Sequence, residues 1–391
     1  MCRIGTNVNE SFTILNEVPL QLHMWWNNLG EGNKEIVARI LGGLVGLLNV
    51  KPKSDVIEAL IPFWDPTRNV FRFGGFELTP TLEEVAGYAG LNGNMRGQYL
   101  LSPRPVSPHK FLDLLNISRS VQNDDLSGGC CTLQFLYQRY GNPRGFEEPN
   151  LGLTHAGNRS KWEARRTLAF ITAFLGIVIC PRVDKKIETG PVGMVDVAIK
   201  RADSTIVALI LSEIYRALTV CREGGHFFQE FEKRVRGIAF PEGTEAWLIR
   251  LRSLTADQIE WAFGWFPVTE VLYMSAGECH ILLIGVRSIQ PYAPHRVLRQ
   301  LGRFQVIPKD EDLSKHVIEL RLRATFPEDK IRKLWNECWF LEPKTMVRDL
   351  AKGEVDPKYN AWFGKRLQIL QRPAKRAHVQ QFTNDSQEQW G

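Results

Sequence analysis

Apolar residues recur at helical spacing from the start of the chain onward. Leu15, Val18, Leu22, Trp25 and Leu29 are separated by three or four residues, which is the spacing of one face of an α-helix. The pattern predicts a first helix that ends at the glycines that follow it.

A second helix is predicted from Lys34 to Leu48, although it contains Gly42, Gly43 and Gly46. These glycines lower the intrinsic helix propensity of the segment. We expect the close approach of a neighbouring helix to compensate for that loss.

Most of the remaining chain also shows helical signals. Ser107 and Pro108 form a favourable N-cap and N1 pair for one of these helices. Further helices are predicted at residues 107–115, 131–141, 162–179, 204–221, 294–301, 313–324, 327–339, 346–351 and 360–371.

One stretch combines a hairpin with a capped helix. The β-branched and aromatic segment 70–73 precedes two glycines, and Phe76 and Leu78 alternate with a polar residue after them, so a small β-hairpin is expected. Thr81 then precedes Glu84 at capping-box spacing, and a C′ glycine ends the predicted helix.

A second hairpin is predicted from the β-rich segments 271–274 and 280–286, which are separated by Ser-Ala-Gly-Glu. The strands are too few and too far apart for a doubly wound sheet. We therefore expect a mainly α fold, a compact multi-helix domain with one or two small β-hairpins.

Composition is typical of a folded globular protein. The chain has 391 residues, of which 44% are hydrophobic and 24% charged, so two or three domains are expected. The first residues lack the continuous apolar region of a secretory signal. The longest apolar run, Leu168 to Cys180, is too short to span a bilayer. We expect an intracellular protein with no membrane segment and, because its seven cysteines form no CxxC pair, with free buried thiols.

The net charge of +6 comes from the last quarter of the chain. Between Lys358 and His378 there are six basic residues, no acidic ones, and several aromatics. Such a segment is suited to phosphate contacts and base stacking, or it is only a solvated basic helix with core aromatics. The candidate nucleic-acid contacts here are Lys365, Arg366, Arg372, Lys375 and Arg376.

A second group of basic residues follows Pro291 and Pro294. Arg296, Arg299 and Arg303 are spaced three and four residues apart, so they would share one side of a helix. They are candidates for gripping phosphate or carboxylate. The alternative is pairing with acidic residues of the same chain.

Catalytic and cofactor motifs are missing from the sequence. It contains no GxxxxGK[ST] phosphate loop, no GxSxG elbow and no pattern for pyridoxal chemistry. Cys279 and His280 are adjacent, but neighbouring strand residues point to opposite faces. The histidines His155, His226, His280 and His295 are isolated in the sequence, so a metal site would have to be assembled from distant segments. We expect no enzyme activity, no cofactor and no catalytic or metal residues.

The segments "FWDPTRNVFRFGGFELTPTLEEVAGYAGL" and "PYAPHRVLRQLG" together resemble the plant mobile domain, also called the aminotransferase-like plant mobile domain. The resemblance covers residues 60–307 and includes MAIN-like proteins derived from transposable elements. It implies roles in meristem maintenance and in the silencing of transposons in the nucleus. We accordingly divide the chain into a plant-mobile-domain-like helical domain at 1–307, a basic helical C-terminal region at 308–378 and a flexible tail at 379–391.

Three functional hypotheses follow. The first is a non-enzymatic protein-interaction module of transposon origin that acts in the nucleus through protein partners not identified by the sequence. The second is a nucleic-acid-binding protein of a plant retroelement that contacts DNA or RNA through its basic C-terminal region. The third is an enzyme whose site is assembled from distant residues, which would require a deep pocket with converging polar side chains.

Overall fold

The computed structural model describes residues 17–91, 95–121, 125–154, 158–223, 241–261, 268, 270–275, 277–320, 328–341 and 353–371. Its α-helices are α1 (Leu20–Asn27), α2 (Glu31–Leu41), α3 (Ser54–Leu60), α4 (Leu82–Ala89), α5 (Pro108–Leu114), α6 (Leu133–Leu136), α7 (Arg159–Phe174), α8 (Pro191–Lys200), α9 (Val207–Arg222), α10 (Thr244–Arg252), α11 (Glu328–Asn336) and α12 (Tyr359–Gln371).

The strands are short and lie in five small sheets within the described residues. They are β1 (Trp64–Asp65), β2 (Val70–Arg72), β3 (Glu77–Leu78), β4 (Tyr99–Leu100), β5 (Leu126–Ser127), β6 (Cys130–Cys131), β7 (Ile187–Glu188), β8 (Ser204–Thr205), β9 (Val271–Ser275), β10 (Ile281–Ile284), β11 (Ser288–Tyr292), β12 (Ile318–Glu319) and β13 (Cys338–Leu341).

The expectation of a mainly α fold with one or two hairpins is therefore wrong, and the protein is an α/β mixture. Most strands have only two residues. A strand this short shows no alternation of apolar and polar positions, so its sequence gives no periodic signal.

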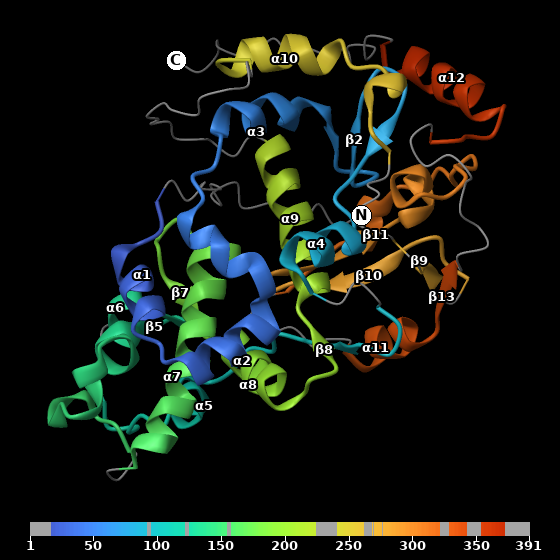
Figure 1. Cartoon of the computed structure of the whole chain (residues 1–391). Helices are drawn as coiled ribbons and strands as arrows, with labels where there is room; N and C mark the ends of the chain where they lie inside the picture. Colours follow the sequence, from blue (N-terminus) through green and yellow to red (C-terminus); the bar gives the residue numbers. More distant parts are fainter. Residues whose placement is uncertain are drawn as a thin grey trace, which may run out of the picture.

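Helix α9 runs through the middle of the molecule and joins its two largest hydrophobic clusters (Figure 1). Leu209 and Ile210 pack in a helical cluster with residues of α1, α2 and α7. Leu211 and Tyr215 pack in a second cluster with β10, β11 and α4. Because α9 contributes to both clusters, it fixes the helical part against the sheets.

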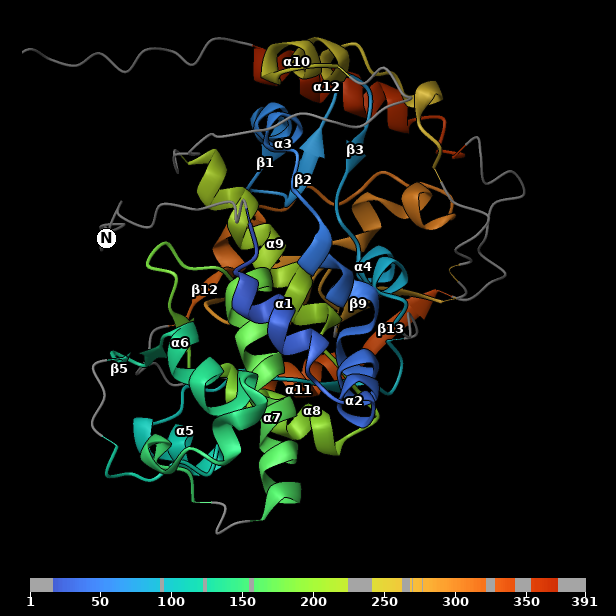
Figure 2. The same ribbon diagram turned by 60° about the vertical axis from the view of Figure 1, so that its left-hand side comes forward.

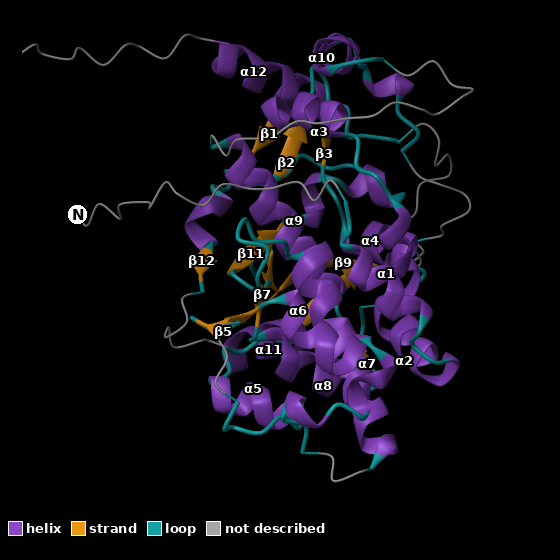
Figure 3. Ribbon diagram, turned by 90° about the vertical axis from the view of Figure 1, so that its left-hand side faces the viewer, coloured by secondary structure: helices purple, strands orange, loops and turns teal. Residues whose placement is uncertain are grey.

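A third, smaller cluster lies at the end of the molecule where α10 and α12 are seen (Figure 2). Phe73 and Phe76 of the predicted hairpin pack there with Ala59 of α3, Leu251 of α10 and Trp261. The hairpin lies beside α3 (Figure 3).

The predicted hairpin and capped helix are confirmed. Strands β2 and β3 pair antiparallel, with Phe71 opposite Leu78. The Thr81 side chain accepts from the Glu84 backbone N–H and the Glu84 carboxylate accepts from the Thr81 N–H, which completes the capping box. Gly90 ends α4 with a left-handed φ of 62°.

The expected close approach at the glycines of the second predicted helix is found at Gly42 but not at Gly46. α2 ends at Leu41 and continues as the 3₁₀ segment η1 (Gly42–Asn49). A Cβ placed on Gly42, where φ is +54°, would lie 2.0 Å from the Ala89 carbonyl oxygen at the end of α4. Gly42 thus allows the close approach, whereas Gly46 has no atom within 4 Å of such a Cβ.

The second predicted hairpin is wrong. β9 pairs with β13, and β10 pairs with β11 rather than with β9. The sequence shows which segments favour strands, but the partner of β9 lies more than sixty residues further along the chain, so local spacing does not reveal it.

Two predicted helices also differ. Residues 294–301 form two short 3₁₀ turns, η8 (Pro294–Arg296) and η9 (Leu298–Leu301), because Val297 between them has a φ of −129°. The segment predicted as a helix at 313–324 contains η10 (Leu313–His316) followed by strand β12. The predicted helix at 346–351 lies outside the described residues.

The predicted domain boundary at residue 307 separates strands that pair with one another in two sheets. β12 pairs with β11 and β13 pairs with β9, so strands on both sides of the boundary share backbone hydrogen bonds. The two portions consequently form joint sheets in the described structure, while the tail at 379–391 lies outside the described residues.

Candidate binding site

The three arginines predicted to grip a ligand are buried instead. Arg296, Arg299 and Arg303 are only 2%, 5% and 1% exposed. The Arg296 guanidinium donates to both oxygens of the buried Glu77 carboxylate, with Nε to Oε2 at 3.0 Å and Nη2 to Oε1 at 2.9 Å. This pair is internal to the fold.

Arg299 lies over aromatic rings. Its guanidinium carbon is 3.5 Å from the centroid of a Trp261 ring and 5.5 Å from that of Tyr359, and burial lowers the pKa of Arg299 to about 10. Arg303 donates to the backbone carbonyls of Leu301 and Val268. All three guanidiniums therefore contact protein groups and do not present a charged face to nucleic acid.

These contacts join the two sequence segments that carry the family resemblance. Asn69 Nδ2 donates to the Pro291 carbonyl at 2.8 Å. Gln300 Nε2 donates to the Thr79 carbonyl at 2.7 Å and to the Glu84 carboxylate at 2.8 Å. Together with the Arg296–Glu77 pair, they make the two segments a single buried structural junction, here called the signature junction.

The predicted C-terminal contacts are only partly within the described chain. Lys365 is exposed on α12. Arg366 is paired with Asp310, with Nη2 2.6 Å from Oδ1. Arg372, Lys375 and Arg376 lie outside the described residues.

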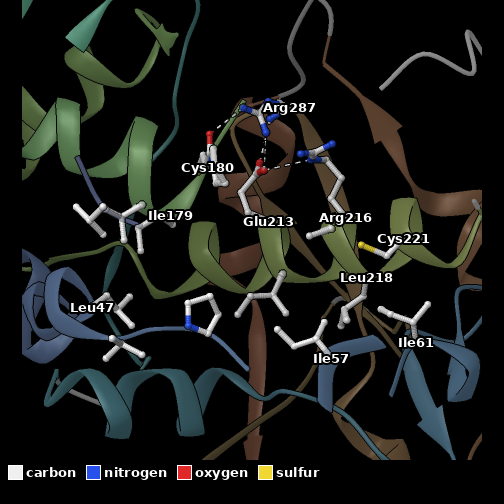
Figure 4. A pocket seen from close by; sticks show the side chains of 17 residues that line it. Leu47, Ile57, Ile61, Ile179, Cys180, Glu213, Arg216, Leu218, Cys221 and Arg287 are labelled. Carbon is white, nitrogen blue, oxygen red and sulfur yellow. Dashed lines mark hydrogen bonds and ion pairs between the residues drawn. The ribbon is translucent and has the colours of Figure 1, made fainter. Parts of the chain in front are cut away.

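A mainly apolar pocket of about 320 Å³ lies between α9, α3, η1 and the π-helical segment η6 (Leu175–Ile179) that continues α7 (Figure 4). Val50 at its edge is 55% exposed, so the pocket reaches the surface. Its apolar lining includes Leu47, Ile57, Ile61, Ile179, Ala217 and Leu218.

Glu213, Arg216 and Arg287 form the charged side of the pocket, and Figure 4 shows them grouped together. Arg216 Nε donates to Glu213 at 3.1 Å, and Arg287 Nη1 is 3.8 Å from the same carboxylate. The backbone N–H groups of Val286 and Arg287 also donate to Glu213. Arg287 also pairs with Glu188, which lies outside the pocket lining, with Nε 2.7 Å from Oε1. Two cations and one anion thus line the pocket itself.

Two thiols line the pocket, those of Cys180 and Cys221. Burial raises the pKa of Cys221 to about 12 and raises that of Cys180 well above its usual value. A thiol is nucleophilic only as the thiolate, so neither cysteine is an activated nucleophile at neutral pH.

One group of side chains has the donor atoms of a metal site. His280, Glu311 and His316 place one ligand atom each within 4.8 Å of one another. His316 Nε2 is 3.0 Å from Glu311 Oε1, and His280 Nδ1 is 3.7 Å from Glu311 Oε2. Burial and the neighbouring His316 lower the pKa of His280.

Sequence reasoning identified neither of these groups. The residues of the pocket come from five separate segments of the chain, and no local motif marks them. His280 was considered beside Cys279 and as an isolated histidine, while Glu311 and His316 lie about thirty residues further on. The one available signal was the local spacing of Glu311 and His316, which is too common to be specific.

No described helix has both the length and the apolar character required to cross a membrane. Residues 25–368 match the model of a family described as a domain of unknown function, DUF7745. No curated protein and no solved structure matches the chain. The family match covers most of the sequence, and the chain belongs to the DUF7745 family.

Proposed function

We propose that the protein is a non-enzymatic protein-interaction module of transposon origin, acting in the nucleus in silencing or development, and that it binds its partner in the pocket beside α9. The observation that carries the proposal is an apolar pocket that reaches the surface and has a charged side. The transposon origin and the nuclear role rest on the resemblance to the plant mobile domain.

The size of the pocket indicates what it holds. About 320 Å³ is at the lower end of the volumes of ligand sites, and it accommodates one or two large apolar side chains. We infer that a Leu, Ile, Met or Phe of the partner enters between Ile57, Leu218 and Ile179. Burying such a side chain contributes about 1.5–3 kcal/mol.

The charged side of the pocket selects the neighbouring residue of the partner. Arg216 pairs with Glu213, and Arg287 pairs with Glu188 at 2.7 Å and lies 3.8 Å from Glu213. We infer that a carboxylate of the partner joins this group of ion pairs. A partner segment with Asp or Glu next to its apolar anchor therefore complements both parts of the pocket. Hydrogen bonds to charged groups are worth about 1.5–3 kcal/mol.

The chemistry of the lining supports binding rather than catalysis. Its acid is held by two backbone N–H groups and an arginine, and the pKa values of its thiols are raised. A general base or nucleophile needs a free acceptor or a thiolate within reach of substrate.

Binding of nucleic acid through the basic C-terminal region is less well supported. Within that region Arg366 pairs with Asp310, and the candidate arginines that precede it, Arg296, Arg299 and Arg303, are buried. Lys365 is the candidate that remains exposed in the part of the chain that the structure describes.

The proposal is tested by selecting peptides from a random display library on the purified full chain. We expect the selected peptides to share a large apolar residue beside Asp or Glu. Replacing that acidic residue by its amide should weaken binding roughly tenfold or more, because a charge-assisted hydrogen bond is lost.

Ala217→Trp fills the pocket and should abolish binding of the selected peptides. Ala38→Trp is the matched control, because Ala38 is exposed on α2 away from the pocket. Peptides that bind Ala217→Trp as tightly as the parent chain would refute the pocket as the binding site.

A further inference from the structure

We propose that His280, Glu311 and His316 bind a divalent transition-metal ion, with Zn²⁺ as the ion that the ligand set suits best. The three ligand atoms already lie within 4.8 Å of one another. The inference is independent of the pocket and goes beyond partner binding.

Two buried polar atoms of the His280–Glu311–His316 cluster lack hydrogen-bond partners. His280 Nδ1 and Glu311 Oε2 are inaccessible and make no hydrogen bond. Buried polar groups are nearly always hydrogen-bonded or coordinate a metal ion, because burial without a partner costs free energy. The distance between these two atoms is 3.7 Å, which is too long for a hydrogen bond.

That distance matches two ligands of one metal ion. Zinc binds imidazole nitrogen and carboxylate oxygen at about 2.0–2.2 Å in a tetrahedron, which places neighbouring ligand atoms about 3.4 Å apart. The 3.7 Å from His280 Nδ1 to Glu311 Oε2 and the 3.0 Å from His316 Nε2 to Glu311 Oε1 are close to this value, and each imidazole faces its own oxygen of the carboxylate. Small rotations of the side chains would bring all three to an ion.

An ordinary ion pair does not explain the cluster. The contact between Glu311 and His316 satisfies one carboxylate oxygen but leaves the other oxygen and His280 Nδ1 without partners. The rings of His280 and His316 are also only 4.1 Å apart between centroids. A shared cation accounts for both imidazoles facing one carboxylate.

The fold holds the ligands on two anchored segments. His280 directly precedes β10, which pairs along its whole length with β11. Glu311 precedes η10 and His316 is its last residue. In this segment the Asp312 carboxylate accepts from the Ser314 N–H, and the Leu313 N–H donates to the Thr67 carbonyl at 2.7 Å. Both segments are therefore positioned before an ion arrives.

The ligand types favour zinc over magnesium or calcium. Two imidazoles and one carboxylate suit Zn²⁺ and other late first-row ions, whereas Mg²⁺ and Ca²⁺ require oxygen ligands. Three protein ligands leave a fourth position for water or for a group of another molecule. The side chains of His316 and Glu311 are 34% and 21% exposed, which gives the ion a route from solvent.

The experiment is a Zn²⁺ titration of the full chain, prepared without a polyhistidine tag, by competition with a chromophoric chelator. Metal content is measured in parallel by mass spectrometry. We expect one tightly bound equivalent, and a Co²⁺-loaded sample with the visible absorption of a tetrahedral site.

His316→Ala and Glu311→Gln should each weaken Zn²⁺ binding by at least about 100-fold, since loss of even an outer-shell partner typically costs 10–100-fold. His109→Ala is the control, because His109 is exposed on α5. Near-ultraviolet circular dichroism checks that each variant is folded. A parent chain that binds no Zn²⁺, or folded variants that bind it as tightly as His109→Ala, would overturn the proposal.

Discussion

Glu83 is a buried carboxylic acid whose pKa is raised by its surroundings. It is only 2% exposed, and it accepts hydrogen bonds from the Leu272 N–H at 3.4 Å and the Tyr292 hydroxyl at 3.3 Å. Burial, with a smaller contribution from Glu84, raises the pKa of Glu83 to about 7. Glu83 lies in the first turn of α4, and its burial could not be predicted from the local sequence because its contacts come from the distant strands β9 and β11.

This pKa predicts a fall in stability with rising pH. The folded protein keeps the Glu83 proton up to about pH 7, whereas the unfolded chain releases it near the ordinary value of 4.5. The free energy of unfolding should therefore fall by about 3 kcal/mol as pH rises from about 4.5 to 7 and change little above that, as far as Glu83 is concerned.

Glu83→Gln removes this contribution. Urea unfolding at pH 5 and at pH 8 should show that the variant gains stability relative to the parent at the higher pH. Parallel pH profiles for parent and variant would show that Glu83 is ionised in the folded state.

At the scale of elements, the sequence predicted the helices and hairpins whose caps and turns are formed by residues close together in the chain. The capped helix α4 and the β2–β3 hairpin were located correctly because their caps and turns involve residues close in the chain. The pairing of β9 with β13 was missed because it depends on a distant segment. For the same reason the pocket and the histidine cluster, each built from separate segments, were not foreseen.

The contact between η1 and α4 can be tested with two glycines of the same segment. Gly42→Ala should lower the free energy of unfolding by at least about 2 kcal/mol, because a side chain there adopts a left-handed φ and its Cβ meets the Ala89 oxygen at 2.0 Å. Gly46→Ala should be neutral or slightly stabilising, since its Cβ meets nothing within 4 Å. Chemical denaturation of both variants measures the difference. Equal effects would mean that η1 does not approach α4 this closely.

At the scale of the whole molecule, the residues that join the two motif segments contact one another inside the protein. The Glu77–Arg296 pair, the Asn69–Pro291 contact and the Gln300 contacts connect segments about two hundred residues apart. The proposed binding pocket is built from other residues. The central claim is therefore that the signature junction stabilises the fold, while binding occurs beside α9.

The most direct test of that claim is a stability and binding measurement on the double variant Glu77→Leu/Arg296→Met. Glu77→Leu leaves the buried Arg296 without its carboxylate, and Arg296→Met leaves Glu77 with only the longer 3.5 Å contact to Arg72. Each single change should therefore cost about 3–5 kcal/mol. The double variant should cost less than the sum of the two by at least about 2 kcal/mol, and it should bind the selected peptides as the parent chain does. A double variant that is folded and stable but no longer binds those peptides would contradict the claim, because the signature junction would then belong to the binding site.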